Sequence, residues 1–361
     1  MAQEMKQSTI LVTLLTKFLL FCEFFPIATC ESRLILSNES KLNKWLDYNI
    51  EKFKEANVKL NQTCYKLNKM ESNLDGALAT AEAGVKVITV KKDGSGNFQT
   101  VSDAINSIPM SNANRVVIKI GGGSYWEKIT IDRSKQFITF YGDPNDMPKI
   151  CFNGTAAQYG TVYSSTVAIE SDYFVAVNIE FVNTAPMPDG KREGAQAVAM
   201  RISGDKSAFY HCKFIGTVDF IFGDGQSLYL NTTIRSVSSG IGVITAHARE
   251  NESEESGFEF VHCSIIGAGK TKLGRAWKQR PRMIFAHTYM DTVVSSEGWA
   301  DDMSDGEHKP VYYGEYKCWG PGGSSSGRAK FVRMLSDEEA QPFLSTTFIN
   351  GNNWIIPPPK V

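Results

Sequence analysis

The stretch HCKFIGTVDFIFGDGQSLYLNTTI, residues 211–234, carries the clearest indication of the fold. It groups β-branched and aromatic residues into short runs separated by Gly, Asp and Asn, a pattern that indicates short strands joined by tight turns. Its opening, HCKFIG, recurs loosely at Asn178 (NIEFVN), Asn231 (NTTIRS), His262 (HCSIIG) and His287 (HTYMDT). Irregular repeats of this size, each one or two strands plus a turn, are what a stacked β-solenoid needs.

The same texture extends from Val85 onward. Further strands are expected over residues 86–90, 115–120, 136–142, 173–183, 197–202, 227–234 and 257–267. Only one helix is expected among them, over residues 101–108, ending at Pro109. This argues against an alternating β/α fold, and the uneven strand spacing places a β-sandwich second to a solenoid. Cys212 and Cys263 occupy matching positions of the repeat and are expected inside the coil as small apolar side chains.

The N-terminal part differs from the rest. Residues 1–30 contain an apolar stretch too short to span a bilayer, which predicts a secretory signal peptide; a buried helix of a cytosolic protein is the alternative. Residues 31–84 are expected to be a helical lead packed on the main domain. The chain also has five Asn-x-Ser/Thr sequons, at Asn38, Asn61, Asn153, Asn231 and Asn251. Together these features predict a secreted, extracellular glycoprotein.

The amino-acid composition limits the kinds of binding partner that the protein can have. The 361 residues include 38 Lys and Arg against 39 Asp and Glu, a net charge of -1. No basic excess is available to neutralise a phosphate backbone, so nucleic acid is not expected as a partner. A hydrophobic share of 42% with 21% charged residues fits a globular protein that has no membrane contact once the signal is removed, and we expect a monomer. Seven Cys cannot all pair within one chain, which excludes a fully paired disulfide scaffold.

One segment places a carboxylate where it is costly. In GTVDFIFGDG, residues 216–225, strand alternation would put Asp219 on the face of Ile221, opposite Phe220 and Phe222. An acidic side chain in an apolar run must face a polar cleft or be paired. Asp219 is therefore a candidate functional residue, with a structural Asp that holds a turn as the alternative.

A second segment, LGRAW, residues 273–277, sets Arg275 and Trp277 two positions apart in a strand-like run. Both would project from one face and offer a cation beside a flat apolar surface. That pair suits a sugar ring that carries a carboxyl group or its ester. A surface Arg that covers a core Trp is equally compatible with this segment.

Four motifs in order carry a family resemblance. They are GSYWEK (123–128), GAQAVAMR (194–201), GTVDFIFG (216–223) and LGRAW (273–277), and YYGEYKC (312–318) and PFLSTTFINGNNWI (342–355) extend the similarity. Over roughly residues 85–357 the chain resembles the plant pectin methylesterases.

The resemblance implies an all-β fold, a single-stranded right-handed parallel β-helix of the pectin lyase-like type, over residues 85–359. It implies hydrolysis of the methyl esters of polygalacturonan in the plant cell wall, with release of methanol and without metal or cofactor. By motif, Asp219 would be the nucleophile, Arg275 would hold its carboxylate, and Trp277 would stack on a galacturonate ring. Gln196 matches an amide that stabilises the oxyanion, and Thr166 matches a substrate-contact position.

The sequence departs from the family at one point. The family's general acid lies in a Q-D-[ST]-L motif, with a second oxyanion Gln beside it, but no such motif occurs between Gln196 and Asp219. KFIG runs directly into TVDFIFG at Gly216, as though about 20 residues, near one solenoid repeat, were missing. Fold would survive such a loss, whereas the acid and one oxyanion donor would not.

Other side chains could replace the acid only poorly. Asp205 and Asp224 lie in turn sequences and are expected to form turns, and His247, alone in a strand, is expected to be structural. The alternative function is thus a catalytically inactive pectin-binding β-helix protein. A lyase or a polygalacturonase is less favoured, because neither a Ca²⁺-binding acid cluster nor a paired-carboxylate motif for glycoside cleavage is recognisable.

Overall fold

The computed structural model describes residues 75–187, 193–300, 303–304, 307–308, 310–344 and 350–356. All of these described residues belong to one compact unit, Leu34–Val361. The expected signal peptide, the lead up to residue 74 and the sequons at Asn38 and Asn61 lie outside the described residues. Within the described part, no helix is long and apolar enough to cross a membrane.

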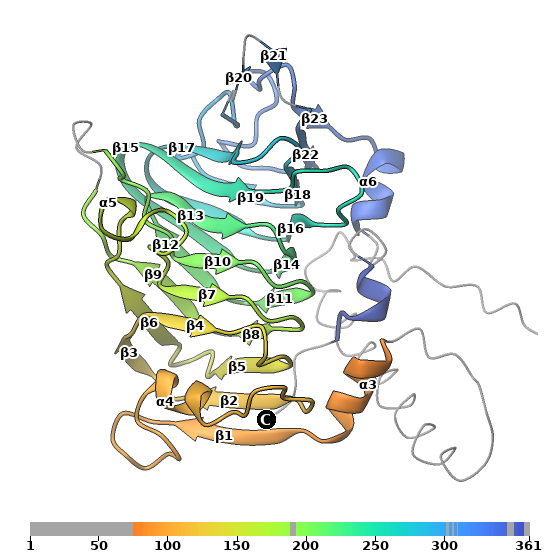
Figure 1. Cartoon of the computed structure of the whole chain (residues 1–361). Coiled ribbons are helices and arrows are strands. Elements are labelled where there is room, and N and C mark those ends of the chain that lie inside the picture. Colours follow the sequence, from red (N-terminus) through yellow and green to blue (C-terminus); the bar gives the residue numbers. More distant parts are fainter. Residues whose placement is uncertain are drawn as a thin grey trace, which may run out of the picture. The chain divides into compact units, whose positions relative to one another are not determined.

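The strands form three columns, in which hydrogen-bonded neighbours belong to successive coils of the chain (Figure 1). The first column is a ten-stranded parallel sheet with the spatial order β1 (Lys86–Val90), β2 (Val116–Ile120), β5 (Ile138–Gly142), β8 (Val175–Val177), β11 (Ser207–Tyr210), β14 (Gln226–Leu230), β16 (Gly257–Val261), β18 (Arg282–Ala286), β22 (Tyr312–Tyr316) and β23 (Arg333–Met334). The uniformly parallel pairing requires a full turn of chain between neighbours.

The other two columns are joined by long strands. The second column contains β3 (Gly123–Trp126), β6 (Pro148–Phe152), β9 (Glu180–Asn183), β12 (Lys213–Gly216), the first parts of β15 (Thr233–His247) and β17 (Ser264–Ala276), and β19 (Tyr289–Met290). The third contains β4 (Ile129–Ile131), β7 (Val167–Ile169), β10 (Met200–Ile202), β13 (Val218–Gly223) and the second parts of β15 and β17. This arrangement confirms the predicted parallel β-helix.

The remaining elements are short. They are the helices α3 (Gly76–Ala83), α4 (Val101–Asn106), α5 (Ala156–Tyr159) and α6 (Asp337–Leu344), the 3₁₀ helix η1 (Gly351–Asn353) and the antiparallel pair β20 (Met303–Ser304) and β21 (Glu307–His308). The expected helix over residues 101–108 is confirmed as α4, with Thr100 as its N-cap. Helices α5 and α6 were not expected.

The repeated motif marks one corner of the coil. Six residues with left-handed backbone conformation separate the first column from the second in successive coils: Asn178, His211, Asn231, His262, His287 and Lys317, with φ between 46° and 57°. The first five are the residues at which the motif begins. A left-handed residue turns the chain sharply, so 173–183 and 257–267, each expected as one strand, are two strands with a corner between them.

Apolar side chains fill the inside of the coil. Stacked rings link successive coils of the first column, with centroids 4.9 Å apart for Phe209 and Tyr229 and 4.3 Å apart for Tyr229 and Phe260. Cys212 and Cys263 are buried in the same interior, as expected, and burial raises the pKa of each thiol to about 12. Such ladders stabilise every coil through its neighbours alone.

A second apolar cluster lies on the outer face of the first column. Helices α3 and α6 lie against this face (Figure 1). Their side chains and those of the C-terminal segment cover the cluster, including Leu78, Phe343 and Trp354, which pack with Leu228 and Ile284. Helix α3, which falls within the expected lead, packs on this face through Leu78 and Ala81.

Candidate functional site

Asp219 lies in a bulge of β13. Its φ is +53°, and the register between β13 and β15 shifts between Val218 and Ile221. The strict alternation predicted for this strand is therefore wrong: Phe220 and Ile221 both belong to the interior cluster, whereas Phe222 packs on the outer face. A left-handed residue in a strand inverts the alternation beyond it, and here it turns the Asp219 carboxylate toward Arg275 instead of along Ile221.

Arg275 holds this carboxylate with two parallel hydrogen bonds. Its Nε donates to Asp219 Oδ1 at 2.9 Å, and its Nη2 donates to Oδ2. The two residues come from β13 and β17, which β15 separates, so their side chains bridge two strand spacings, about 9.6 Å. Arg275 is in register with Ala246 of β15 and, through it, with Phe222 of β13, so its side chain also reaches back along the strands to Asp219. The Asp219 side chain is 1% exposed and that of Arg275 is 33% exposed. A bidentate guanidinium favours the ionised form of a buried carboxylate.

Trp277 stands beside the pair. Its ring is 41% exposed and contacts the outward Phe222, with centroids 4.2 Å apart. Phe222 in turn packs with Val198 and Ala246. The expected cation beside a flat apolar surface is therefore present, and Trp277 is not a core residue covered by Arg275.

Gln196 and Thr166 lie on the two preceding coils. Gln196 is half-buried, and the next residue, Ala197, donates its N–H to the Val218 carbonyl at 3.1 Å, which places Gln196 beside the start of the Asp219 strand. Thr166 is fully buried, and its hydroxyl donates to the Val182 carbonyl at 2.9 Å. Its side chain is thus engaged inside the coil and is not presented on the outer face.

In the third column of the described strands, no strand lies between the segment that follows Gln196 and the strand of Asp219. β10 pairs directly with β13, with Met200 opposite Ile221 and Ile202 opposite Gly223. The coil made of β11, β12 and β13 is short: Ser207 pairs with Ser227, whereas Gln226, in the next coil, pairs with Gly257. The pairing of strands in successive coils is continuous where KFIG meets TVDFIFG at Gly216. The packing is tight there, because a Cβ added to Gly216 would lie 2.4 Å from the Cβ of Phe220.

The three substitute acids occupy structural positions. Asp205 Oδ1 accepts a hydrogen bond from the Gln226 N–H at 3.0 Å and so holds a turn. Asp224 is exposed in the following turn. His247 is fully buried, its Nδ1 accepts from the Arg282 N–H at 3.1 Å, and burial, with Arg282 and Arg249, lowers its pKa to about 3. The described residues contain no group of three His, Cys, Asp or Glu able to hold a metal ion.

One further pair was missed in the sequence. Arg201, the last residue of GAQAVAMR, is in register with Phe222. Its guanidinium lies 5.9 Å from the ring centre of Tyr163, which is 63% exposed, and it is also paired with Glu170. Arg201 could have been singled out, because it is the last residue of the motif GAQAVAMR, but no pattern in the sequence predicts its contact with Tyr163.

Together these features define a class: a parallel β-helix protein whose outer face carries a buried carboxylate clamped by arginine beside an exposed tryptophan. The chain belongs to the pectinesterase family, a family of carboxylic ester hydrolases. The family model described as Pectinesterase matches residues 87–217 and 211–352.

Individual relatives agree with this assignment. Pectinesterase 1 of Olea europaea is 42% identical over 360 residues, covering 93% of this chain and 94% of that protein. A pectinesterase-family protein of Arabidopsis thaliana is 51% identical over 293 residues, covering 75% of this chain and 87% of its own length. Among solved structures, the pectin methylesterase from carrot is 31% identical with a TM-score of 0.62, covering 74% of this chain and 94% of that one.

Proposed function

We propose that this protein acts on the methyl esters of cell-wall pectin through Asp219, with turnover impaired by the loss of one coil. The observation that carries the proposal is the bidentate bond between Arg275 and the buried Asp219 carboxylate. The carrot relative, a pectin methylesterase by name, supplies the substrate class. The exposed ring of Trp277 provides a platform for a sugar.

The reaction divides into two steps. The Asp219 carboxylate oxygen attacks the ester carbonyl carbon, and the carbonyl oxygen takes the developing negative charge, toward which the Gln196 amide N–H donates. Methoxide leaves and takes up a proton as methanol, so that an anhydride joins Asp219 to the galacturonate. Water then attacks this anhydride, which releases the galacturonate carboxylate, regenerates the Asp219 carboxylate and liberates two protons, one of which replaces the proton taken up by methoxide. Arg275 keeps the attacking carboxylate ionised and oriented throughout.

Both steps need a group that gives a proton to methanol and then takes one from water. In the family this group lies on the coil between the Gln196 and Asp219 motifs, and here β10 and β13 are direct neighbours. The family model also matches residues 211–217 twice, at the end of one segment and the start of the next, and Gly216 lies in that overlap. Both observations support the loss of one repeat at this point.

The second candidate is a pectin-binding protein without turnover. The same missing coil favours it, because Arg275 and Trp277 would still hold a galacturonate ring while the proton transfers fail. In either case we infer a secreted, monomeric glycoprotein of the cell wall. The exposed sequons Asn153 and Asn251 support the glycosylation.

Methanol release from esterified pectin tests the proposal, with pectin binding measured on the same samples. Three proteins are compared: the natural chain, Asp219→Ala, and a variant in which one family coil carrying the Q-D-[ST]-L motif is inserted after Gly216. The inserted coil should raise turnover by about 10² or more, and Asp219→Ala should abolish release but keep binding. Equal turnover with and without the coil would disprove impairment, and release by Asp219→Ala equal to that of the natural chain would disprove the nucleophile. Binding without any release by the natural chain would establish the second candidate.

A further inference from the structure

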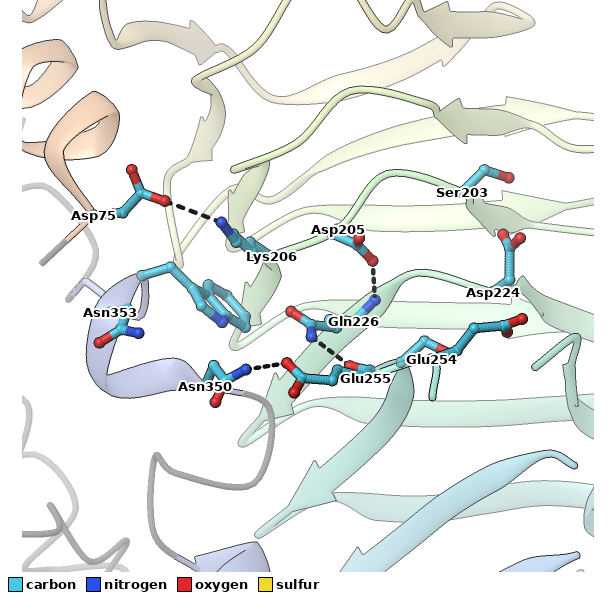
Figure 2. A pocket seen from close by; sticks show the side chains of 12 residues that line it. Asp75, Ser203, Asp205, Lys206, Asp224, Gln226, Glu254, Glu255, Asn350 and Asn353 are labelled. Atoms are coloured by element: carbon cyan, nitrogen blue, oxygen red, sulfur yellow. Dashed lines mark hydrogen bonds and ion pairs between the residues drawn. The ribbon is translucent and has the colours of Figure 1, made fainter. Parts of the chain in front are cut away.

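Two cavities lie at opposite ends of the third-column strands and differ in charge. The first, of about 730 Å³, lies where these strands turn back to the first column (Figure 2). Its lining has one cation, Lys206, and five carboxylates: Asp75, Asp205, Asp224, Glu254 and Glu255. The second, of about 650 Å³, lies where the strands begin, and its lining has one carboxylate and three cations: Glu297, Lys270, Lys272 and Arg328. An anionic ligand is therefore favoured at the second cavity, which we call the lysine cavity.

The lysine cavity has an uncompensated positive charge. Lys270 is exposed and forms no ion pair with any described residue, and its one hydrogen bond, to the Thr292 carbonyl, is 3.5 Å long. Lys272 is paired with Glu297 at 2.9 Å, and that carboxylate is 58% exposed. Exposed hydroxyls complete the polar lining, on Thr292, Ser296, Ser324 and Ser326. The N–H groups of Lys270 can thus donate to a ligand, and the hydroxyls can both donate and accept.

Arg328 holds the walls of the lysine cavity in place and is not itself available to a ligand. Its Nε donates to the fully buried Glu315 carboxylate at 2.7 Å. Its Nη1 donates to the Ser296 carbonyl at 3.0 Å, and its Nη2 donates to the Gly322 carbonyl at 2.7 Å. These bonds join the two loops that supply most of the lining. A site with preformed walls loses less conformational entropy on binding than a site made of loose loops.

The lysine cavity adjoins the candidate active site through one row of partly exposed side chains. Lys272 is in register with Val243 of β15, which is in register with Val218 of β13. Val218 directly precedes Asp219. Neighbouring strands are about 4.8 Å apart, so the row is about 9.6 Å long. A chain-like ligand bound beside Asp219 can therefore reach the cavity.

The lining matches an acidic sugar. The volume lies within the range of about 300 to 1,000 Å³ that is usual for small-ligand sites. The lysine ammonium groups suit a carboxylate, and Glu297 with the hydroxyls suits sugar hydroxyl groups. Ile241 is 75% exposed in the same lining and offers an apolar surface to the C–H face of a ring. A methyl-esterified uronate lacks the charge that would pair with Lys270, so the free acid is favoured over its ester.

We propose that the lysine cavity is a subsite for a galacturonate residue whose carboxylate is free, in the same pectin chain that presents an ester to Asp219. The choice of galacturonate rests on the proposed function, whereas the preference for a free carboxylate rests on Lys270 and Lys272. Pectin that is already partly de-esterified should therefore bind better than fully esterified pectin.

Titration of the full natural chain with unesterified trigalacturonate at pH 7 tests the subsite, because this ligand has no ester to hydrolyse. Lys270→Met/Lys272→Met should weaken its binding by about tenfold, since two charge-assisted contacts are lost. The matched control, Lys86→Met/Lys119→Met, removes the same charge from exposed positions of β1 and β2 and should bind as the natural chain does. A galactose trimer with the same linkage but no carboxylates should bind equally to all three proteins.

Four results would overturn the proposal. The first is equal binding of trigalacturonate by the lysine variant and the natural chain. The second is equal weakening in the control pair, which would indicate a diffuse field. The third is displacement of trigalacturonate by inorganic phosphate at the same concentration of charge, which would indicate a site for any anion. The fourth is a gain in affinity from trimer to decamer that Trp277→Ala leaves unchanged, which would show that the ligand in the cavity does not continue into the active site.

Methanol release by the same samples separates this subsite from the proposed function. Binding of trigalacturonate that depends on Lys270 and Lys272, without any methanol release, would uphold the subsite and refute turnover alone. Methanol release with binding that is independent of both lysines would refute the subsite alone.

Discussion

Replacing Arg275 by Met should leave the Asp219 carboxylate buried without its guanidinium partner. Removing one member of a buried ion pair costs about 3 to 5 kcal/mol. The Arg275 side chain is one-third exposed, so water can reach its side of the pair and the lower end of that range applies, about 3 kcal/mol. Asp219→Asn should cost less, about 1 kcal/mol, because the arginine left behind can be hydrated.

The double variant Asp219→Asn/Arg275→Met gives the clearest result. Without the carboxylate no buried charge remains, so the two effects should not add. The coupling should be about 2 kcal/mol, which makes the double variant more stable than Arg275→Met. Urea unfolding measures each free energy, with unchanged m-values as the condition for comparison. Lys272→Met is the matched control, because Lys272 lies on the same strand as Arg275 and pairs at 2.9 Å with a carboxylate, that of Glu297, which is exposed. Water can hydrate the carboxylate left behind, so this change should cost less than about 1 kcal/mol.

The penalty of Arg275→Met belongs to the ionised carboxylate, so it should shrink in acid, where the carboxylate becomes protonated. Additive single effects, or a double variant no more stable than Arg275→Met, would refute the view that Arg275 stabilises a buried charge at this position.

Three further outcomes are expected. Glu259 is buried in the region of the outer apolar cluster with Oε1 unpartnered, and burial raises its pKa well above the usual value. The stability of the protein should therefore fall as the pH rises above about 4.5, by at most about 1.4 kcal/mol per pH unit. Glu259→Gln should stabilise the protein in urea unfolding at pH 7 but not at pH 4, and an equal gain at both pH values would contradict this. The pKa of His247 is lowered to about 3, so stability should fall as the pH drops below about 6.5, and His247→Asn should flatten that slope, whereas parallel pH profiles would count against it. Peptide mass spectrometry of protein secreted from plant cells should find a glycan on the exposed Asn153 but none on Asn231. Asn231 lies in the corner between β14 and β15, where its Nδ2 is 3.0 Å from His211 Nδ1. A glycan on Asn231 would show that this corner forms after glycosylation.

The repeat was legible in the sequence because a solenoid places equivalent residues at equivalent corners. Asn178, His211, Asn231, His262 and His287 begin the repeated motif, and each adopts the left-handed conformation at one corner of its coil. The motif therefore predicted both the solenoid and its interior, including Cys212. It did not predict where the strands break, because apolar runs continue across a corner without interruption.

The geometry around Asp219 was less accessible. The prediction from strand alternation was wrong there, because one left-handed residue reverses the face on which every following side chain lies. No residue type in TVDFIFG indicates the bulge. The cation and the exposed ring of LGRAW were predicted from their spacing of two, which a regular strand preserves. The burial of Thr166 was not predicted, because its hydroxyl partner, the Val182 carbonyl, belongs to another coil.

The repeat, the family and the gap between the QAVAM and TVDFIFG motifs were predictable from the amino-acid sequence, since all three depend on the local order of residues along the chain. That Asp219 meets Arg275 across β15, and that β10 adjoins β13 where the gap falls, became visible only in the folded chain. The cause is the stacking of coils. It brings together side chains 20 to 56 residues apart, at distances set by backbone hydrogen bonds between coils and not by any pattern within one.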